Sequence, residues 1–193
     1  APARAHPHIF IEARAEVQYE NGTFTGIVQR WTFDEYYSST AIVDLDTNKD
    51  GIYDRQELAE LAKVNMDGLK EFAYFTTPTL AGKEVKLGEV KEYWLEHKDG
   101  LLTLVFKLPF EQPILSDAKD FRFVIADPTF MIGFQWAKPD PVTFSKGAPK
   151  SCSAKFGAAD KEGDDQALRG ALQQQFGAAA VAMDGTVEVH CAP

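Results

Sequence analysis

The chain has 193 residues, of which 45% are hydrophobic, so it is long enough to bury the core of one domain spanning residues 1–193. Its net charge of −9 argues against a nucleic-acid partner, because an acidic surface repels phosphates. The sequence also contains no apolar run long enough to span a bilayer.

The first predicted element is a half-buried strand that leads into a hairpin. Every second residue over 9–17 is apolar, which is the period of a strand with one buried face. Asn21-Gly22 is a favoured two-residue hairpin turn, so Thr23 to Phe33 is predicted to return antiparallel to the first strand. In the register set by that turn, His8 lies level with Glu35.

Residues 32–73 are predicted to form an inserted, EF-hand-like helix-loop-helix. The first helix is expected to begin near Thr32, where T-F-D-E places Glu35 in the position of a capping box. An acidic loop follows. The second helix then presents one apolar face, which consists of Leu58, Leu61, Ala62, Leu69 and Phe72.

The acidic loop, DTNKDGIYDRQE, matches the twelve-residue calcium-binding loop at each constrained position. Gly51 occupies the position of the sharp turn, and Ile52 is expected to offer its backbone carbonyl. Side-chain oxygens are expected from Asp46, Asn48, Asp50, Asp54 and Glu57. Calcium sensors use paired loops, whereas this chain has one, so we expect a structural Ca²⁺ that ties the two helices together.

From Phe75 onward the sequence pattern indicates strands separated by short turns. The predicted strands are 83–90, 93–96, 101–108, 121–126, 131–136, 142–144 and the final TVEVHC. One further helix is expected over 165–176, and the Ala/Gly-rich stretches after Ser153 are expected to be loops. Runs of antiparallel strands with an early helical insertion indicate an α+β fold, an antiparallel β-sandwich-like domain.

Two of the four histidines stand close together near the start of the sequence, in RAHPHIF. On a strand His6 and His8 point to the same side, and imidazole suits zinc, nickel, copper and cobalt. A zinc site normally takes three or four protein ligands, so others are expected from Asp127 or, with less weight, from Asp34 and Glu35. The alternative is a solvated terminal segment without a ligand role.

The two cysteines, Cys152 and Cys191, are too far apart in sequence for a zinc-thiolate pair, and one disulfide is their simplest use. A disulfide indicates an oxidising compartment, whereas two unpaired buried thiols would suit a cytosolic protein. The small residues of the opening APARAH suit the start of a mature chain after signal-peptide removal. We therefore expect a periplasmic protein.

The other two histidines are weaker candidates for metal ligands. His97 is expected in the hairpin turn EHKDG, and His190 is expected to face solvent on the last strand, because it alternates with Val187 and Val189. The sequence contains no HExxH helix, GxSxG elbow or P-loop. We therefore expect no enzymatic activity.

Several stretches together resemble one family over residues from about Ala5 to Cys152. They are AHPHIFIEA, RWTFDEYYS, the calcium-type loop, EYWLEHKDGLLTLVFKLPF and IADPTFMIGF. With these stretches, the sequence resembles the family called domain of unknown function 1007. That resemblance implies the periplasmic component of a transport system, found beside nickel/cobalt-type permeases, and for one branch it implies zinc uptake.

Carried over by motif, the resemblance matches His6 and His8 to the family's histidine pair, Asp127 to its DPT aspartate and 46–57 to its acidic loop. The function we expect is a metal-binding accessory protein that captures or delivers a transition metal for an inner-membrane permease. Zinc is the first expectation, with nickel and cobalt as alternatives. The competing interpretation is a calcium-stabilised adaptor that docks to a permease and binds no transition metal.

Overall fold

The computed structural model describes residues 8–127, 129, 131–157 and 186–192. The helices are α1 (Glu35–Ala41) and α2 (Ala59–Lys70), with a 3₁₀ turn at Ala73–Phe75. The strands are β1 (Ile9–Glu20), β2 (Thr23–Phe33), β3 (Thr76–Leu80), β4 (Lys83–Glu84), β5 (Tyr93–Lys98), β6 (Leu101–Leu115), β7 (Phe121–Ile125), β8 (Ile132–Trp136), β9 (Val142–Phe144), β10 (Cys152–Gly157) and β11 (Thr186–Cys191).

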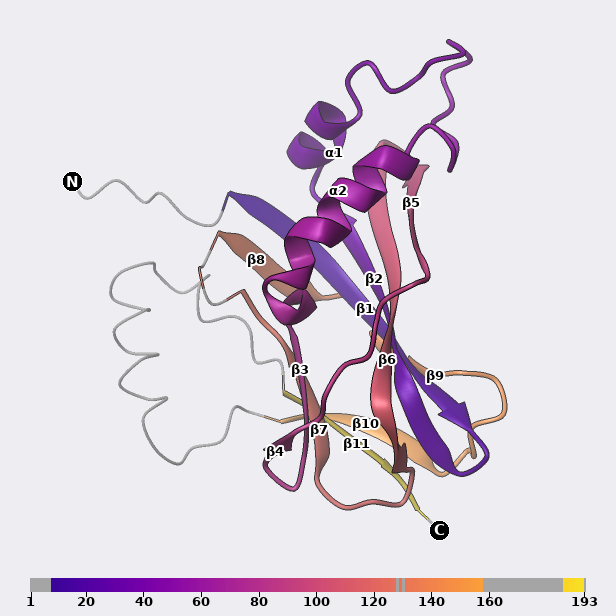
Figure 1. The fold of residues 1–193 in the computed structure, drawn as a ribbon, viewed down its shortest axis with the longest axis vertical. Helices are drawn as coiled ribbons and strands as arrows, with labels where there is room; N and C mark the ends of the chain where they lie inside the picture. Colours follow the sequence, from indigo (N-terminus) through magenta and orange to yellow (C-terminus); the bar gives the residue numbers. More distant parts are fainter. Residues whose placement is uncertain (1–7, 128, 130, 158–185, 193) are drawn as a thin grey trace, which may run out of the picture.

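The described residues are mostly β and form two sheets around a shared core. One sheet has the order β5-β6-β2-β1-β8, with β9 also paired to β1, and the other has the order β10-β11-β7-β3-β4. Figure 1 shows α1, α2 and the loop between them gathered at one end of the molecule. The mixture of helices and β-sheets agrees with the predicted α+β class.

Alternation of apolar residues places the core. On β1 the predicted apolar side chains from Ile11 to Val17 are buried, while those between them are exposed or half-buried. Trp31 of β2 is fully buried and packs edge-on against Phe106 and Phe134, with ring centroids 4.8 Å apart in both pairs. A period of two therefore predicted the buried face correctly.

The predicted hairpin is confirmed, but its register changes along its length. Asn21 and Gly22 both have positive φ, which a type I′ turn requires. A bulge in β2 opposite Gln18 and Tyr19 then shifts the pairing by one residue, so Ile11 faces Phe33. The expected alignment of His8 with Glu35 is therefore wrong, because a turn-based register does not anticipate a bulge.

Gly26 lies at this bulge for a steric reason. A Cβ atom at this position would collide with the backbone carbonyl of Leu108 on β6. β2 also changes its register with β6 between Phe24 and Gly26. The irregularity is thus accommodated by the one residue type that lacks a side chain.

The expectation of a purely antiparallel sandwich is wrong at one edge. β8 and β9 both pair with β1 in parallel, and Ile9 lies opposite Ile132. This pairing brings the segment that follows β7 back beside the first residues of β1. Alternation of apolar residues along a strand does not indicate whether its neighbour runs parallel or antiparallel, so the sequence did not predict this arrangement.

Both predicted helices exist, with shifted boundaries. α1 begins at Glu35 because Asp34, rather than Thr32, is its N-cap, and β2 continues through Phe33. α2 begins after the acidic loop and buries Ala62 and Met66. Phe72 lies beyond the helix and is 46% exposed, so its predicted place on the buried face is wrong.

The later strands match the prediction with local differences. The strand predicted over 83–90 is reduced to Lys83–Glu84, with an isolated bridge from Leu87 to Phe110. β10, at 152–157, lies where a loop was expected and pairs with β11. The helix predicted over 165–176 lies outside the described residues.

Candidate metal sites

The first residues of β1 are held on both sides by segments that carry predicted ligands. The His8 N–H donates to the Met131 carbonyl at 2.9 Å. On the other side, the Phe10 N–H donates to Asp34 Oδ2 at 2.7 Å and the Asp34 N–H donates to the Phe10 carbonyl at 2.9 Å. His8 and Asp34 are therefore brought to the same end of the sheet, while His6 lies outside the described residues.

Asp127 belongs to the same end of the sheet, and its carboxylate is fully engaged. Oδ1 accepts from the N–H and the hydroxyl of Thr129 at 2.8 and 2.7 Å, and Oδ2 accepts from the N–H groups of Met131 and Ile132 at 3.0 and 2.9 Å. A carboxylate offers about four acceptor positions, and all four are used here. Asp127 is 5% exposed, and its bonds set the path by which the chain enters β8 beside β1.

Asp34 is less committed than Asp127. Its Oδ1 accepts from the Tyr37 N–H at 2.8 Å as the N-cap of α1, and its Oδ2 takes the Phe10 N–H. Two of about four acceptor positions therefore stay open. Glu35 follows in the first turn of α1 and is exposed. Of the three carboxylates predicted as ligands, Asp34 combines a fixed position with the capacity to accept a further bond.

The acidic loop folds around its own short polar side chains. Asp46 accepts from the N–H groups of Asp50 and Gly51 at 3.2 and 3.0 Å, and Asn48 Oδ1 accepts from the Asp50 N–H at 2.9 Å. Asp50 Oδ1 in turn accepts from the Ile52 N–H at 2.8 Å. The side chains of Asp46, Asn48 and Asp50 therefore accept hydrogen bonds from backbone N–H groups within the loop itself.

Glu57 joins the end of the loop to its beginning. Oε1 accepts from the N–H and hydroxyl of Thr47, both at 2.9 Å, and Oε2 accepts from the Asp54 N–H at 3.3 Å. The pKa of Glu57 is lowered, first by the Thr47 hydroxyl and then, against a smaller effect of burial, by the backbone donors. Among the described residues no group of three or more His, Cys, Asp or Glu side chains is arranged to hold a metal.

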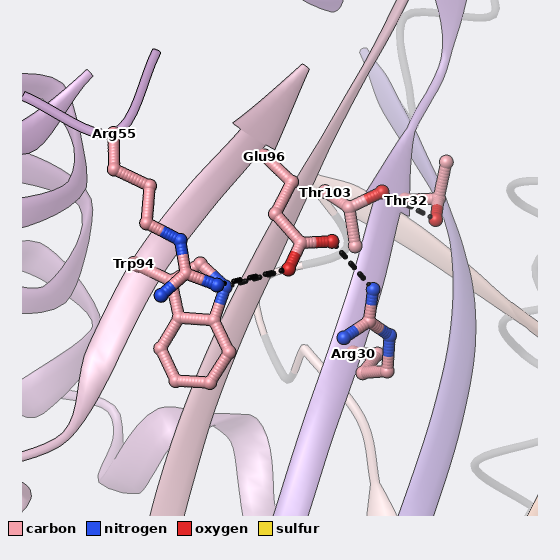
Figure 2. Close-up of polar contacts among 6 residues, drawn as sticks. All are labelled: Arg30, Thr32, Arg55, Trp94, Glu96 and Thr103. Atoms are coloured by element: carbon pink, nitrogen blue, oxygen red, sulfur yellow. Dashed lines mark hydrogen bonds and ion pairs between the residues drawn. The ribbon is translucent and has the colours of Figure 1, made fainter. Parts of the chain in front are cut away.

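The loop is attached to strand β5 by contacts that the sequence analysis missed (Figure 2). The Arg55 guanidinium lies 4.4 Å from the centroid of the Trp94 ring and 3.5 Å from Glu96 Oε1. Glu96 also accepts from Trp94 Nε1 and from Arg30, both at 2.7 Å. Burial raises the pKa of Glu96, but these hydrogen bonds and the two arginine charges outweigh that effect and lower it.

The remaining described histidines, His97 and His190, lie on β5 and β11. His97 is on β5, half-buried and edge-on to Tyr53 of the loop at 4.8 Å, so its predicted place in the turn is wrong. Its Nε2 atom is buried and has no hydrogen-bond partner among the described residues. His190 is half-buried and alternates with the fully buried Val187 and Val189, so it points away from the core, as its strand position predicted.

A disulfide joins Cys152 to Cys191, which lie directly opposite each other on β10 and β11. This confirms the predicted pairing and is consistent with an extracytoplasmic protein. Among the described helices, none is both long enough and apolar enough to cross a membrane.

Sequence comparisons place the chain among proteins whose roles are unassigned. The sequence model of a family described as "Protein of unknown function (DUF1007)" matches residues 1–189. An uncharacterised protein of Haemophilus influenzae is 27% identical over 153 residues, which cover 79% of this chain and 72% of the relative. An "Uncharacterized 15.5 kDa protein in trpE 3'region" of Spirochaeta aurantia is 30% identical over 102 residues, 52% of this chain and 71% of the relative.

Proposed function

This chain belongs to the DUF1007 family, and from that premise we propose that it is a periplasmic accessory protein that captures or delivers a transition metal for an inner-membrane permease. The observation that carries the proposal is the pair of hydrogen bonds at the start of β1. They hold His8 between Met131 on one side and, through Phe10, Asp34 on the other. Asp34 thus lies against Phe10, two residues along β1 from His8. An imidazole together with a carboxylate that has open acceptor positions is a donor set that zinc accepts.

In this proposal His6, His8 and Asp34 supply the protein ligands, and zinc is the first expected metal, with nickel and cobalt next. Residues two apart on a strand point to the same side, so we propose that the His6 and His8 imidazoles bind the same cation. Asp127 was predicted as a ligand from its sequence position. Its four accepted hydrogen bonds support a different contribution, which is to place the β8 segment against His8.

Calorimetric zinc titration, with calcium held saturating, tests this proposal. The parent protein is compared with a His6→Ala/His8→Ala double variant and with Asp34→Asn. We expect the parent to bind one zinc, the double variant to lose that binding and Asp34→Asn to bind at least about tenfold more weakly. Equal weak binding by the parent and the double variant would reject the histidine site.

We also propose that the loop from Asp46 to Glu57 binds a structural Ca²⁺, the finer form of the predicted EF-hand-like insertion. The side-chain oxygens of Asp46, Asn48 and Asp50 support this. A calcium ion would replace the backbone donors that now occupy Glu57, so we expect weak binding, with a Kd on the order of 10⁻⁴ to 10⁻³ M. Calcium should raise the melting temperature of the parent, and Glu57→Gln should abolish the rise while the exposed Glu60→Gln keeps it.

A second candidate function is an adaptor that docks to a permease and binds no transition metal. Two large apolar side chains beside the start of β1 favour it, since Phe10 is 51% exposed and Met131 is 43% exposed. Phe10→Ser combined with Met131→Ser should then abolish co-purification with the permease, whereas the His6→Ala/His8→Ala variant should still co-purify, and the parent should bind no zinc. If the histidine variant alone disrupts co-purification, metal capture is the better explanation.

A further inference from the structure

The outer face of the β5-β6-β2-β1 sheet carries an unusual row of side chains. Trp94 pairs with Val105, Val105 pairs with Arg30 and Arg30 pairs with Arg14, so the four residues run directly across four strands. Like charges directly opposite each other on adjacent strands destabilise a sheet. Two opposed arginines in a chain of net charge −9 therefore call for a specific explanation.

Each guanidinium is held in place and still keeps donors to spare. Arg14 donates to the carbonyls of Pro139 and Lys138 at 3.2 and 3.3 Å, and among the described residues it has no carboxylate within ion-pair distance. Arg30 donates to Glu96 at 2.7 Å, and Figure 2 shows Glu96 between Arg30 and the indole of Trp94. Because a guanidinium has five N–H donors, both arginines can bind a further acceptor without releasing these contacts.

The two arginines line a cavity of about 250 Å³. Its lining includes positively charged, negatively charged and apolar side chains. Val28, Val105 and the Trp94 indole supply the apolar surface, and Val105 is 1% exposed although it points away from the core. Glu16 and Asp140 line the same cavity. The cavity is slightly smaller than the roughly 300–1,000 Å³ typical of pockets for drug-sized ligands.

We propose that this cavity binds a small zwitterion, an α-amino acid with an aliphatic side chain. Its carboxylate binds Arg14 and Arg30, because guanidinium–carboxylate pairs form strong bidentate hydrogen bonds. Its ammonium is attracted by Glu16 and Asp140, and its side chain lies over the valines and the indole. A simple anion would be repelled by the two carboxylates, and a simple cation by the two arginines. The proposal is independent of the metal site, since Arg14 lies about 20 Å along β1 from His8.

A matched ligand series tests the charge requirement. The three ligands share an aliphatic side chain. L-leucine carries both an ammonium and a carboxylate, 4-methylpentanoate carries only the carboxylate, and 3-methylbutylamine carries only the ammonium. The intact protein is titrated with each, and binding is followed by ¹H–¹⁵N NMR at the Trp94 indole, which Trp94→Phe identifies. We expect saturable shifts with leucine at least about tenfold tighter than with either single-charge compound. No saturable shift with leucine, or equal affinity for 4-methylpentanoate, overturns the proposal.

Variants of the cavity locate the binding. Arg14→Gln should weaken leucine binding at least about tenfold, and Glu16→Gln should weaken binding of leucine but not of 4-methylpentanoate. Lys107→Gln is the matched control, because Lys107 lies opposite Val28 on the same face and does not line the cavity. If Lys107→Gln weakens leucine binding as much as Arg14→Gln, overall charge rather than this cavity is responsible. Unchanged melting temperatures establish that each variant is folded.

Discussion

Asp127 and Glu57 show how single carboxylates organise backbone in this protein. Asp127 accepts from N–H groups where the chain enters β8, and Glu57 accepts from N–H groups of the acidic loop. Such charge-assisted bonds are stronger than neutral ones, and a donor left unpaired in a buried place is costly. The sequence predicts that both carboxylates bind a metal, and in the structure both also accept hydrogen bonds that hold the backbone.

Asp127→Asn should lower the free energy of unfolding by about 2 kcal/mol in the absence of metal. The amide replaces one acceptor oxygen with a donor, which leaves either the N–H groups of Met131 and Ile132 or the N–H of Thr129 without a partner. Urea denaturation measures the change. Thr129→Val, which removes the side-chain hydroxyl bond alone, should lose about 1 kcal/mol. An unchanged stability for Asp127→Asn would contradict the structural role.

Acidification should loosen the acidic loop at Glu57. Because the pKa of Glu57 is lowered on folding, its contribution is present above its unfolded value of about 4.3 and is lost as the pH falls through the lower folded value. The amide signals of Thr47 and Asn48 in ¹H–¹⁵N NMR should therefore shift as the pH falls below the ordinary range of a glutamate pKa. In Glu57→Gln the same signals should lack that transition, and a transition that survives the substitution would assign it to another group.

At the scale of elements, α1 and α2 are bonded to each other, and the loop between them contacts a β-sheet. Tyr37 of α1 donates its hydroxyl to Asn65 of α2 at 3.0 Å, and Arg55 and Tyr53 of the loop contact β5. The sequence predicted a clip between two helices. The structure adds that the loop is also docked on the edge strand of a sheet.

Arg55→Ala should free the loop while leaving the sheet almost unchanged. Its contacts with Trp94 and Glu96 are partly exposed, so we expect less than about 1 kcal/mol of lost global stability. Hydrogen exchange of amides over 42–58 should become several-fold faster, whereas exchange in β6 should not change. Lys63→Ala, which removes the exposed pair with Asp67 on α2, is the control and should leave exchange over 42–58 unaltered.

At the scale of the whole molecule, the disulfide closes a long stretch of chain onto the second sheet. It links β10, an edge strand, to β11, which in turn pairs with β7. A Cys152→Ala/Cys191→Ala variant should lose about 4 kcal/mol of unfolding free energy, because the closed loop of 39 residues restricts the unfolded chain. Denaturation of the parent under reducing conditions should give a similar loss. A difference below about 1 kcal/mol would contradict this.

The sequence by itself determined the features that depend on neighbouring residues. Alternation along β1 predicted its buried face, and Asn21-Gly22 predicted the hairpin. The paired cysteines were also predictable, since the chain has only two. Each of these follows from local geometry or counting, so no knowledge of the fold was required.

Tertiary structure decided what depends on distant segments. The bulge opposite Gln18 and Tyr19 moved the register by one residue, and the parallel pairing of β8 with β1 brought Met131, whose N–H bonds to Asp127, against His8. The row from Trp94 to Arg14 exists because four strands align in one register, which no single stretch of sequence specifies. Side-chain patterns report which face of a strand is buried, but strand order, direction and bulges are set by packing of the whole core.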